Sequence, residues 1–198
     1  MSCNLTPCRF REVPSFGRMT IRRFHHNVSE MKRLAARDFE DTLQCQLPVV
    51  EGLFPEHQEL VLDVYFDLAL FHAMAKMRMH TTSTVRDFGG ITRQMCITVR
   101  KFQRDTQNIK TYETDHEQTR RINRARKQAQ EKAVRQAAVA GVEPPSFQVS
   151  LPAAVLKLKE KPLNLETYKW HSAADYPQAV VRKGTLDSFS TQHVCTSC

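Results

Sequence analysis

The stretch Glu59–Met79, ELVLDVYFDLALFHAMAKMRM, decides the fold that we expect for this chain. Its apolar residues recur every three or four positions, and further apolar residues widen that stripe to most of the helix surface. A helix of this kind lies at the centre of a helical domain. Asp63, Asp67 and Arg78 interrupt the stretch, so it does not fit a membrane span. We therefore expect it to be the core helix of a mainly α fold.

A second helix is expected before the core helix. Asn27 can cap its start, and the Glu30 side chain can reach back to it as in a capping box. The apolar residues that follow have helical spacing, and Pro48 is expected to end or kink the helix. One face of this helix is therefore expected to be buried.

A third long helix is expected after the core helix, capped by Thr82 or Ser83. Gly89 and Gly90 lie inside it, and two glycines in a helix interior cost about 2 kcal/mol relative to alanine. A kink or a break is therefore expected at this pair. The apolar positions of this helix repeat every three or four residues: Val85, Phe88, Ile91, Met95, Val99 and Phe102.

The segment from Glu117 to Arg135 has a different character, because it is rich in arginine, lysine and alanine and has few large apolar residues. These residue types favour a helix that buries little surface and projects from the body. Cations presented along a rigid surface are what phosphate groups require. A solvated helix face and a disordered basic linker are the competing interpretations. The candidate nucleic-acid contacts are Arg120, Arg121, Arg124, Arg126 and Lys127.

The expected organisation is an irregular bundle of three to four helices, a projecting basic helix, a Pro-containing linker and a short C-terminal helical piece. In that last piece, Asp175 is expected to cap a short helix that has Pro177 in its first turn and ends at Gly184. The expected ranges are a basic N-terminal segment at 1–26, the helical core at 27–112, the basic helix at 113–141, the linker at 142–162 and the C-terminal segment with a frayed tail at 163–198.

The charge of the chain favours a polyanionic partner. The formal net charge is +8 and the isoelectric point is about 9.4, which favours nucleic acid first and an anionic membrane surface second. The sequence has no recognisable membrane span, and Met1–Phe10 has no apolar leader. We therefore expect an intracellular protein with free thiols, with DNA rather than a membrane as its partner.

Catalytic motifs are not recognisable in the sequence. There is no HExxH, GxSxG, GxGxxG or phosphate-binding Gly-Lys-Ser/Thr pattern. Asp38, Glu40 and Asp41 could hold Mg²⁺, but they fit exposed helix charges better. His72 fits a core histidine with a backbone partner. We expect no enzyme activity, no catalytic residue and no cofactor.

Cysteines near the two ends offer a metal-site alternative. Cys195 and Cys198 form a CxxC pair, and Cys3 and Cys8 form a looser pair. Four thiolates could bind zinc if the two ends met, whereas free thiols are the favoured interpretation. We therefore assign no metal ligand.

Four stretches of the chain resemble a known group of proteins. They are Val13–Phe24 (VPSFGRMTIRRF), Val28–Phe54 (VSEMKRLAARDFEDTLQCQLPVVEGLF), Leu70–Thr84 (LFHAMAKMRMHTTST) and Leu163–Gln192 (LNLETYKWHSAADYPQAVVRKGTLDSFSTQ). In order and spacing they are similar to the C-terminal region of transposon-encoded proteins of mushroom-forming fungi. Those proteins resemble DDE transposases of the CACTA and Kyakuja-Dileera-Zisupton groups. The similarity covers roughly two-thirds of the chain.

This resemblance implies a longer parent protein whose acidic catalytic core lies mainly upstream, in an RNase H-like sheet. It also implies a nuclear location, and it puts a variable basic linker at Glu117–Pro162. The relatives continue after Gln192 with an acidic run, whereas this chain reads His193–Cys198, and Met1–Cys8 has no counterpart in them. The expectation is a truncated, non-catalytic fragment that contacts DNA through its basic helix.

Two other interpretations stay open. The chain is a stand-alone regulatory nucleic-acid-binding protein, or it is a helical module that binds another protein. If the core helix packs on a sheet in the parent protein, its apolar face is left open here, and the isolated chain is expected to self-associate.

Overall fold

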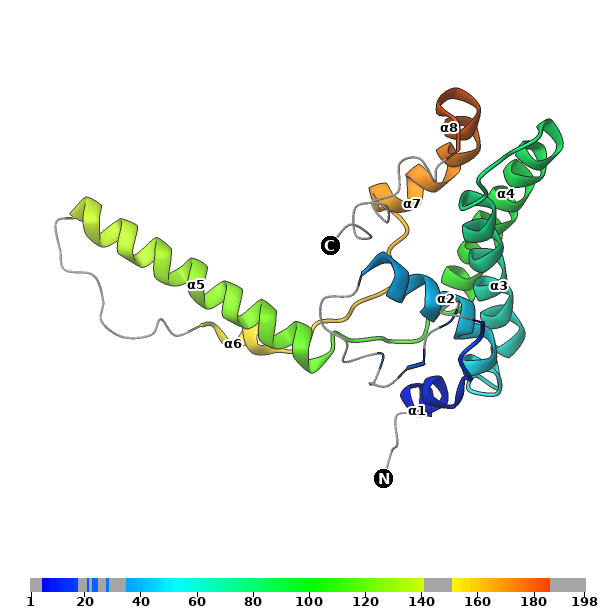
Figure 1. Ribbon diagram of the computed structural model, residues 1–198. Helices are drawn as coiled ribbons and strands as arrows, with labels where there is room; N and C mark the ends of the chain where they lie inside the picture. The colour runs from blue at the N-terminus through cyan, green and yellow to red at the C-terminus, as the bar shows by residue number, and fades with distance from the viewer. Residues whose placement is uncertain are drawn as a thin grey trace. The chain divides into compact units, whose positions relative to one another are not determined.

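The computed structural model describes residues 5–17, 21, 23–24, 28, 35–140 and 151–185 of the chain (Figure 1). These residues are mainly helical, as the sequence predicts, and they belong to two compact units. Unit 1 consists of Met1–Asp105 and Leu165–Cys198, and unit 2 consists of Thr106–Asn164. The C-terminal segment therefore packs with the expected helical core, while the expected basic helix and linker share one unit.

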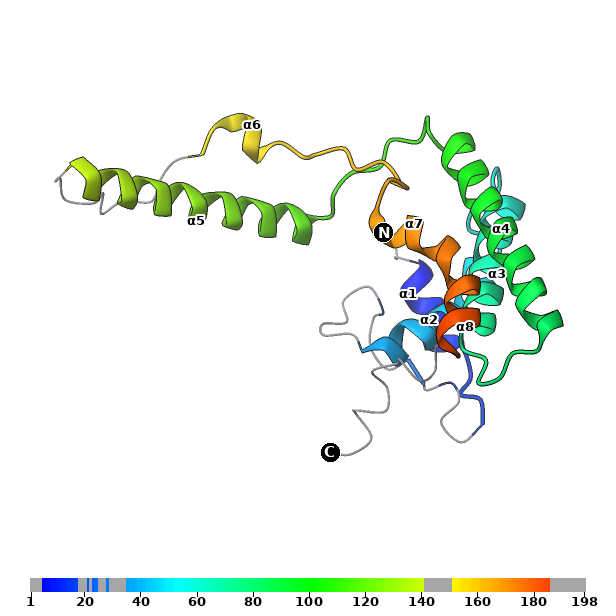
Figure 2. The ribbon, with the colours of Figure 1, turned by 90° about the horizontal axis from the view of Figure 1, so that it is seen from above.

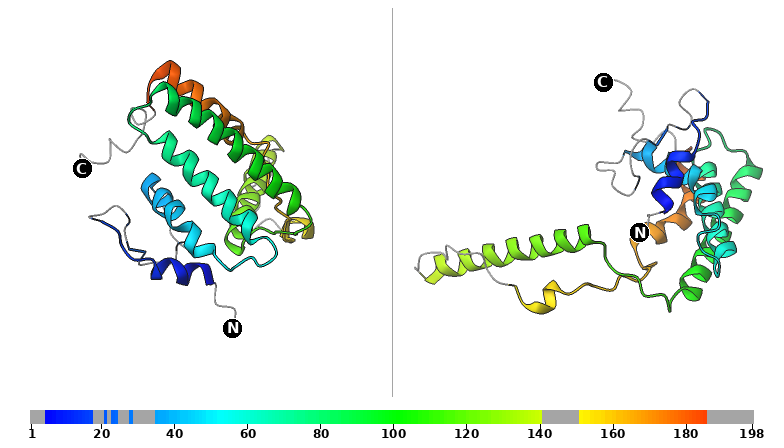
Figure 3. Two further views of the ribbon diagram at one scale, coloured as in Figure 1. Left: turned by 90° about the vertical axis from the view of Figure 1, so that its right-hand side faces the viewer. Right: turned by 90° about the horizontal axis from the view of Figure 1, so that it is seen from below.

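Unit 1 is a series of helices in which each packs on the next along the chain. Its elements are α1 (Leu5–Glu12), α2 (Ala36–Val50), α3 (Gln58–Ala75), α4 (Thr82–Asp105), α7 (Tyr168–Ser172), the 3₁₀ turn η2 (Ala173–Asp175) and α8 (Tyr176–Lys183). α1 packs on α2, α2 on α3 and α3 on α4, and η2 and α8 pack on α4, with Tyr176 of α8 also against Phe71 of α3. Figure 3 (left) shows α2, α3, α4 and α8 side by side in this order.

The core of unit 1 is formed by the apolar faces of α3 and α4, as the periodicity predicts. Phe88 and Met95 on α4 are fully buried, at 0% and 1% exposure. Phe88 packs with Ala75 of α3 and Val180 of α8. Met95 packs with Val99, Ala173 and half-buried residues that include Val64, Leu68 and Trp170. The C-terminal segment therefore completes this core.

α4 differs from the expectation at its start and at its glycine pair. Thr81 caps the helix, one residue before the expected Thr82: its Oγ1 accepts the Thr84 N–H at 3.3 Å, and the Thr84 hydroxyl accepts the Thr81 N–H at 2.8 Å. The helix runs without a break through Gly89 and Gly90, so of the expected kink or break the break is wrong. Burial of the flanking apolar residues outweighs the modest helix penalty of the glycines.

α2 begins later and ends later than expected. Its first residue is Ala36, because Ala35 has extended backbone angles and the Asp38 carboxylate accepts the Ala35 N–H at 2.8 Å. The expected cap residues Asn27 and Glu30 lie outside the described residues. Pro48 does not end the helix, which continues to Val50, since a proline near the last turn removes only one backbone hydrogen bond.

α1, which the sequence did not predict, lies in the basic N-terminal segment at 1–26. Its Phe10 is buried and packs against Phe24 with ring centroids 5.1 Å apart, and against Cys45 and Val49 of α2. Its Arg9 guanidinium donates a hydrogen bond to the Val49 carbonyl at 3.2 Å and a second one to the Glu51 carbonyl. These carbonyls lie at the C-terminal end of α2, where a cation is favourable.

The bounds of α8 agree with the sequence prediction, whereas the end of α3 does not. α8 begins at Tyr176 after Asp175, has Pro177 in its first turn and is followed by Gly184 at φ 87°, as predicted. The Asp175 side chain, however, makes no capping hydrogen bond. α3 ends at Ala75 rather than at Met79, and the Lys76 N–H closes its last turn on the His72 carbonyl at 3.0 Å.

Candidate nucleic-acid interface

Unit 2 is built around the basic helix α5 (Asp115–Ala140) and the short helix α6 (Ala153–Leu156). Figure 2 shows α5 and the segment that carries α6 running side by side. The residues just before α5 pair with the residues after α6 at a short antiparallel bridge between Tyr112 and Glu160. The Lys161 N–H donates to the Thr111 carbonyl at 2.8 Å, and the Thr111 hydroxyl donates to the Lys161 carbonyl at 2.7 Å.

A capping box fixes the start of α5. The Glu117 carboxylate accepts the Thr114 N–H at 3.0 Å, and the Thr114 hydroxyl oxygen accepts the Glu117 N–H at 3.4 Å. Lys161 lies in residues 151–164, which we call the returning segment, and forms an ion pair with the same carboxylate. The pattern Thr-x-x-Glu is readable from sequence, and it could have located this start.

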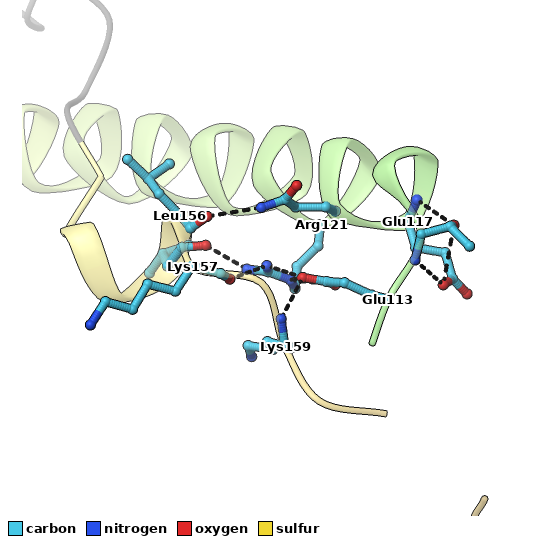
Figure 4. A network of polar contacts seen from close by, with 9 residues as sticks. Glu113, Glu117, Arg121, Leu156, Lys157 and Lys159 are labelled. Carbon is cyan, nitrogen blue, oxygen red and sulfur yellow. Dashed lines mark hydrogen bonds and ion pairs between the residues drawn. The ribbon is translucent and has the colours of Figure 1, made fainter. Parts of the chain in front are cut away.

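Arg121, one of the five candidate contacts, is the centre of an internal network (Figure 4). Its guanidinium forms an ion pair with Glu113, with Nε 2.9 Å from Oε2. It also donates to the Val155 carbonyl at 2.5 Å and to the Lys157 carbonyl at 2.9 Å. Gln118 donates to the Leu156 carbonyl between them, at 2.9 Å. Arg121 and Gln118 therefore satisfy carbonyls at the end of α6 and hold the returning segment on α5.

The electrostatics of this network favour the ion pair. The hydrogen bond from Arg121 lowers the pKa of Glu113 from 4.5 to about 2, with a further contribution from the Lys159 N–H, which donates to the same carboxylate at 3.1 Å. The same pairing raises the pKa of Arg121 above its ordinary value. Four of the N–H groups of the Arg121 guanidinium donate hydrogen bonds within unit 2. Arg121 is therefore a poor candidate for direct phosphate contact.

The other four candidate contacts are exposed on α5 and divide between two faces. Arg120, Arg124 and Lys127 recur at four- and three-residue intervals and therefore lie on one face, as the spacing predicts. Arg126 is exposed on the opposite flank. None of these four cations makes an ion pair within the part of the chain that the structure describes. Glu131, four residues beyond Lys127, ends the cationic face.

The expected linker at 142–162 is only partly described, because residues 141–150, including Gly141, lie outside the described residues. From Leu151 onward, the chain forms α6 and the bridge to Tyr112. This portion is thus a packed partner of α5 and not an open linker. Proline content alone suggested the linker, whereas side chains of α5 determine where this segment lies.

The acidic residues weighed as magnesium ligands have separate structural partners. Asp38 caps α2, Asp41 is buried, and the Glu40 carboxylate accepts the Lys76 ammonium at 3.0 Å and lies 3.7 Å from His72 Nε2. The expectation of exposed helix charges is therefore wrong for Glu40 and Asp41. Burial lowers the pKa of His72, with Lys76 adding to this effect and Glu40 opposing it.

The described ranges show neither a metal cluster nor a membrane-spanning helix. Over the ranges that the structure describes, no three His, Cys, Asp or Glu side chains gather in a way that could hold a metal ion. Cys3, Cys195, Cys198 and the side chain of Cys8 lie outside those ranges. Within them, no helix combines the length and the apolarity that crossing a membrane requires.

Comparison with known proteins found no matching family model, no matching curated protein and no matching solved structure. The similarity to fungal transposon-encoded proteins therefore stays a prediction.

Proposed function

We propose that this chain is a non-catalytic helical region of a transposase-like protein that binds the phosphate backbone of DNA through the exposed face of α5. The residues that carry the proposal are Arg120, Arg124 and Lys127, which we call the α5 cationic face. Arg121 acts as a positioning residue, because it ties the returning segment to α5 next to this face.

The proposal is supported by the different environments of neighbouring arginines. Arg121 is engaged by Glu113 and two carbonyls, while Arg120 and Arg124 on either side of it are exposed and make no ion pair within the described ranges. The face extends over about 10 Å of helix, which allows several phosphate contacts. It carries no aromatic side chain for base stacking, so backbone contact to a duplex fits better than single-strand binding.

The test is the salt dependence of duplex DNA binding by the full chain. In the triple variant Arg120→Gln, Arg124→Gln, Lys127→Gln, we expect weaker binding and a log K against log salt slope that is shallower by up to about 2.7, at about 0.9 per lost phosphate contact. An unchanged slope in this variant rejects the α5 cationic face as a DNA contact.

A charge-matched control separates contact from net charge. Lys169→Gln, Arg182→Gln and Lys183→Gln together remove the same charge from exposed positions on α7 and α8. We expect this control to leave the slope nearly unchanged. If both triple variants lower the slope equally, binding depends on overall charge and the assignment to α5 is wrong.

A second candidate function is self-association through α3, and a specific surface favours it. Leu62, Phe66, Ala69 and Ala73 recur at four-, three- and four-residue intervals on one face, and Phe66 is 55% exposed. The same face on a second copy would make a symmetric contact. Sedimentation should then show concentration-dependent dimers that Phe66→Asp abolishes and Ile97→Asp, at an exposed position on α4, retains. A native chain that stays monomeric at every concentration rejects this candidate.

A further inference from the structure

α4 carries a line of arginines on the face opposite to its buried residues. Arg86, Arg93, Arg100 and Arg104 are all exposed, and we call them the α4 arginine stripe. Gly90 lies between the first two and Ile97 between the second and third, so successive positions are four, three, four, three and four residues apart. This spacing keeps all of them on one helix face over about 27 Å.

The stripe has almost no compensating negative charge. The acidic residues of α4 are Asp87 and Asp105, which lie off the line. Asp105 is 3.5 Å from the Arg104 guanidinium. Arg86, Arg93 and Arg100 make no ion pair within the described ranges, and neither does the exposed Lys101 beside them. On a helix surface, basic residues are commonly stabilised by acidic residues three or four positions away, and this face lacks them.

Gly90 adds a second, independent observation. It is exposed, and a Cβ atom built on it meets nothing within 4 Å, so packing within the described chain does not demand a glycine there. A glycine in a helix interior is less stable than alanine. Its effect is to leave bare backbone on the helix face between positions 86 and 93, where a ligand can approach the helix closely.

We propose that the α4 arginine stripe is a binding surface for the phosphate backbone of a nucleic-acid duplex. The opposite face of α4 is buried, so the helix presents its arginines in a fixed row at intervals of about two turns. Such a row matches a ligand whose negative charges are evenly spaced along its length. The stripe belongs to unit 1, whereas the α5 cationic face belongs to unit 2. The inference shares only the class of partner with the proposed function and does not depend on α5.

A membrane surface is the competing polyanion, and the composition of the face disfavours it. Helices that lie in a membrane interface need a broad apolar face for insertion. On α4, the apolar face is occupied by the core residues Phe88, Met95 and Val99. The exposed side offers one large apolar side chain in the stripe, Ile97.

The experiment compares two triple variants of the full chain with the same loss of charge. Arg86→Gln, Arg93→Gln, Arg100→Gln is the stripe variant, and the α7–α8 triple variant described above is its control. With a duplex of about 20 base pairs, long enough to cover the stripe, we expect the stripe variant to make the salt slope shallower by up to about 2.7. Trp170 fluorescence and helical circular dichroism verify that each variant is folded.

The outcomes separate this inference from the proposed function. A shallower slope in the stripe variant alone supports the stripe and rejects α5, and a shallower slope in the α5 variant alone does the reverse. Arms with DNA and RNA duplexes identify the preferred duplex. If the stripe variant loses binding to anionic phospholipid vesicles but keeps its duplex slope, the stripe is a membrane surface and the inference is overturned.

Gly90→Gln tests the close approach without changing any charge. Glutamine is a better helix former than glycine, so the variant should melt at the same or a higher temperature. Its side chain fills the gap between Arg86 and Arg93, and we expect duplex binding to weaken by several-fold at fixed salt. A variant that is more stable and binds as tightly as the native chain would contradict the phosphate position at Gly90.

Discussion

Different interactions stabilise the interior of unit 1 and that of unit 2. In unit 1, segments far apart in sequence meet through buried apolar side chains, such as Phe88 with Val180 and Met95 with Ala173. In unit 2, the returning segment meets α5 through ion pairs and through side chains that bind backbone carbonyls, with Arg121 at the centre. None of the residues at 115–139 of α5 is buried.

Because of this difference, arginines in the two units have different roles. The stabilisation from apolar burial scales with the buried area, so a unit held in this way tolerates the loss of a surface charge. The polar network around Arg121 depends instead on a few directed hydrogen bonds. An arginine in unit 2 can thus be structural, as Arg121 is, while an arginine on α4 is available to a ligand. The following variants test the contrast between the two units.

The largest effect is expected from emptying the core of unit 1. Phe88→Ala should lower the free energy of unfolding of unit 1 by about 3–5 kcal/mol, because it removes a fully buried aromatic side chain and leaves a cavity. Chemical denaturation followed by Trp170 fluorescence measures this, since Trp170 is the only tryptophan and packs in unit 1. Ile97→Ala, at an exposed position on α4, should change it by less than about 0.5 kcal/mol.

A smaller effect is expected from the buried polar contact between α3 and α4. The Thr98 hydroxyl donates to the Asp67 carboxylate at 2.6 Å, and both residues are buried. Thr98→Val should cost about 1–3 kcal/mol, because it leaves a buried carboxylate without this donor. Thr92→Val is the matched control: its hydroxyl bonds only the Phe88 carbonyl of its own helix at 2.7 Å, so equal losses for the two variants would contradict the account.

In unit 2, Arg121→Gln should release the returning segment without unfolding unit 1. We expect faster amide hydrogen exchange at Glu113, Lys159 and Lys161, whose backbone pairing depends on the Arg121 hydrogen bonds. The Trp170-monitored unfolding of unit 1 should stay the same. Arg120→Gln removes the same charge from the neighbouring exposed position and should leave exchange unchanged; equal acceleration in both variants would show that Arg121 has no special structural role.

The smallest effect is a difference in acid sensitivity between the two units. The pKa of His72 is lowered by burial, so its contribution to unit 1 is complete above pH 6.5 and is lost as the pH falls below that value. The pKa of Glu113 is lowered from 4.5 to about 2, so its contribution to unit 2 is complete above pH 4.5 and is lost between 4.5 and about 2.

Hydrogen exchange as a function of pH, corrected for the intrinsic rate, measures both windows. Unit 1 should begin to lose protection below pH 6.5, and unit 2 only below pH 4.5. His72→Gln should remove the first window and leave the second, because glutamine does not titrate. Loss of protection in unit 2 at pH 6 would be incompatible with the pKa of Glu113.

The sequence predicts the features of this molecule that depend on local spacing. The buried face of α4 follows from the apolar positions around Phe88 and Met95, and the end of α8 follows from Gly184. The same three- and four-residue spacing also marks the α4 arginine stripe, which becomes visible when charged positions are read in the same way as apolar ones.

Features that depend on distant partners were not predictable from spacing. Arg121 is indistinguishable from Arg120 in the sequence, because its partners at Val155 and Lys157 come from a segment 34 and 36 residues further along the chain. α1 was missed for the same reason, since Phe10 is buried by Cys45 and Val49 of α2.

The most direct test of the account is the salt dependence of duplex DNA binding by the native chain. Phosphate contacts by the α5 cationic face alone predict a log K against log salt slope of about −2.7, and the α4 arginine stripe makes it steeper. Binding that is undetectable at low salt, or a slope near zero, contradicts the claim that these cations bind a phosphate backbone.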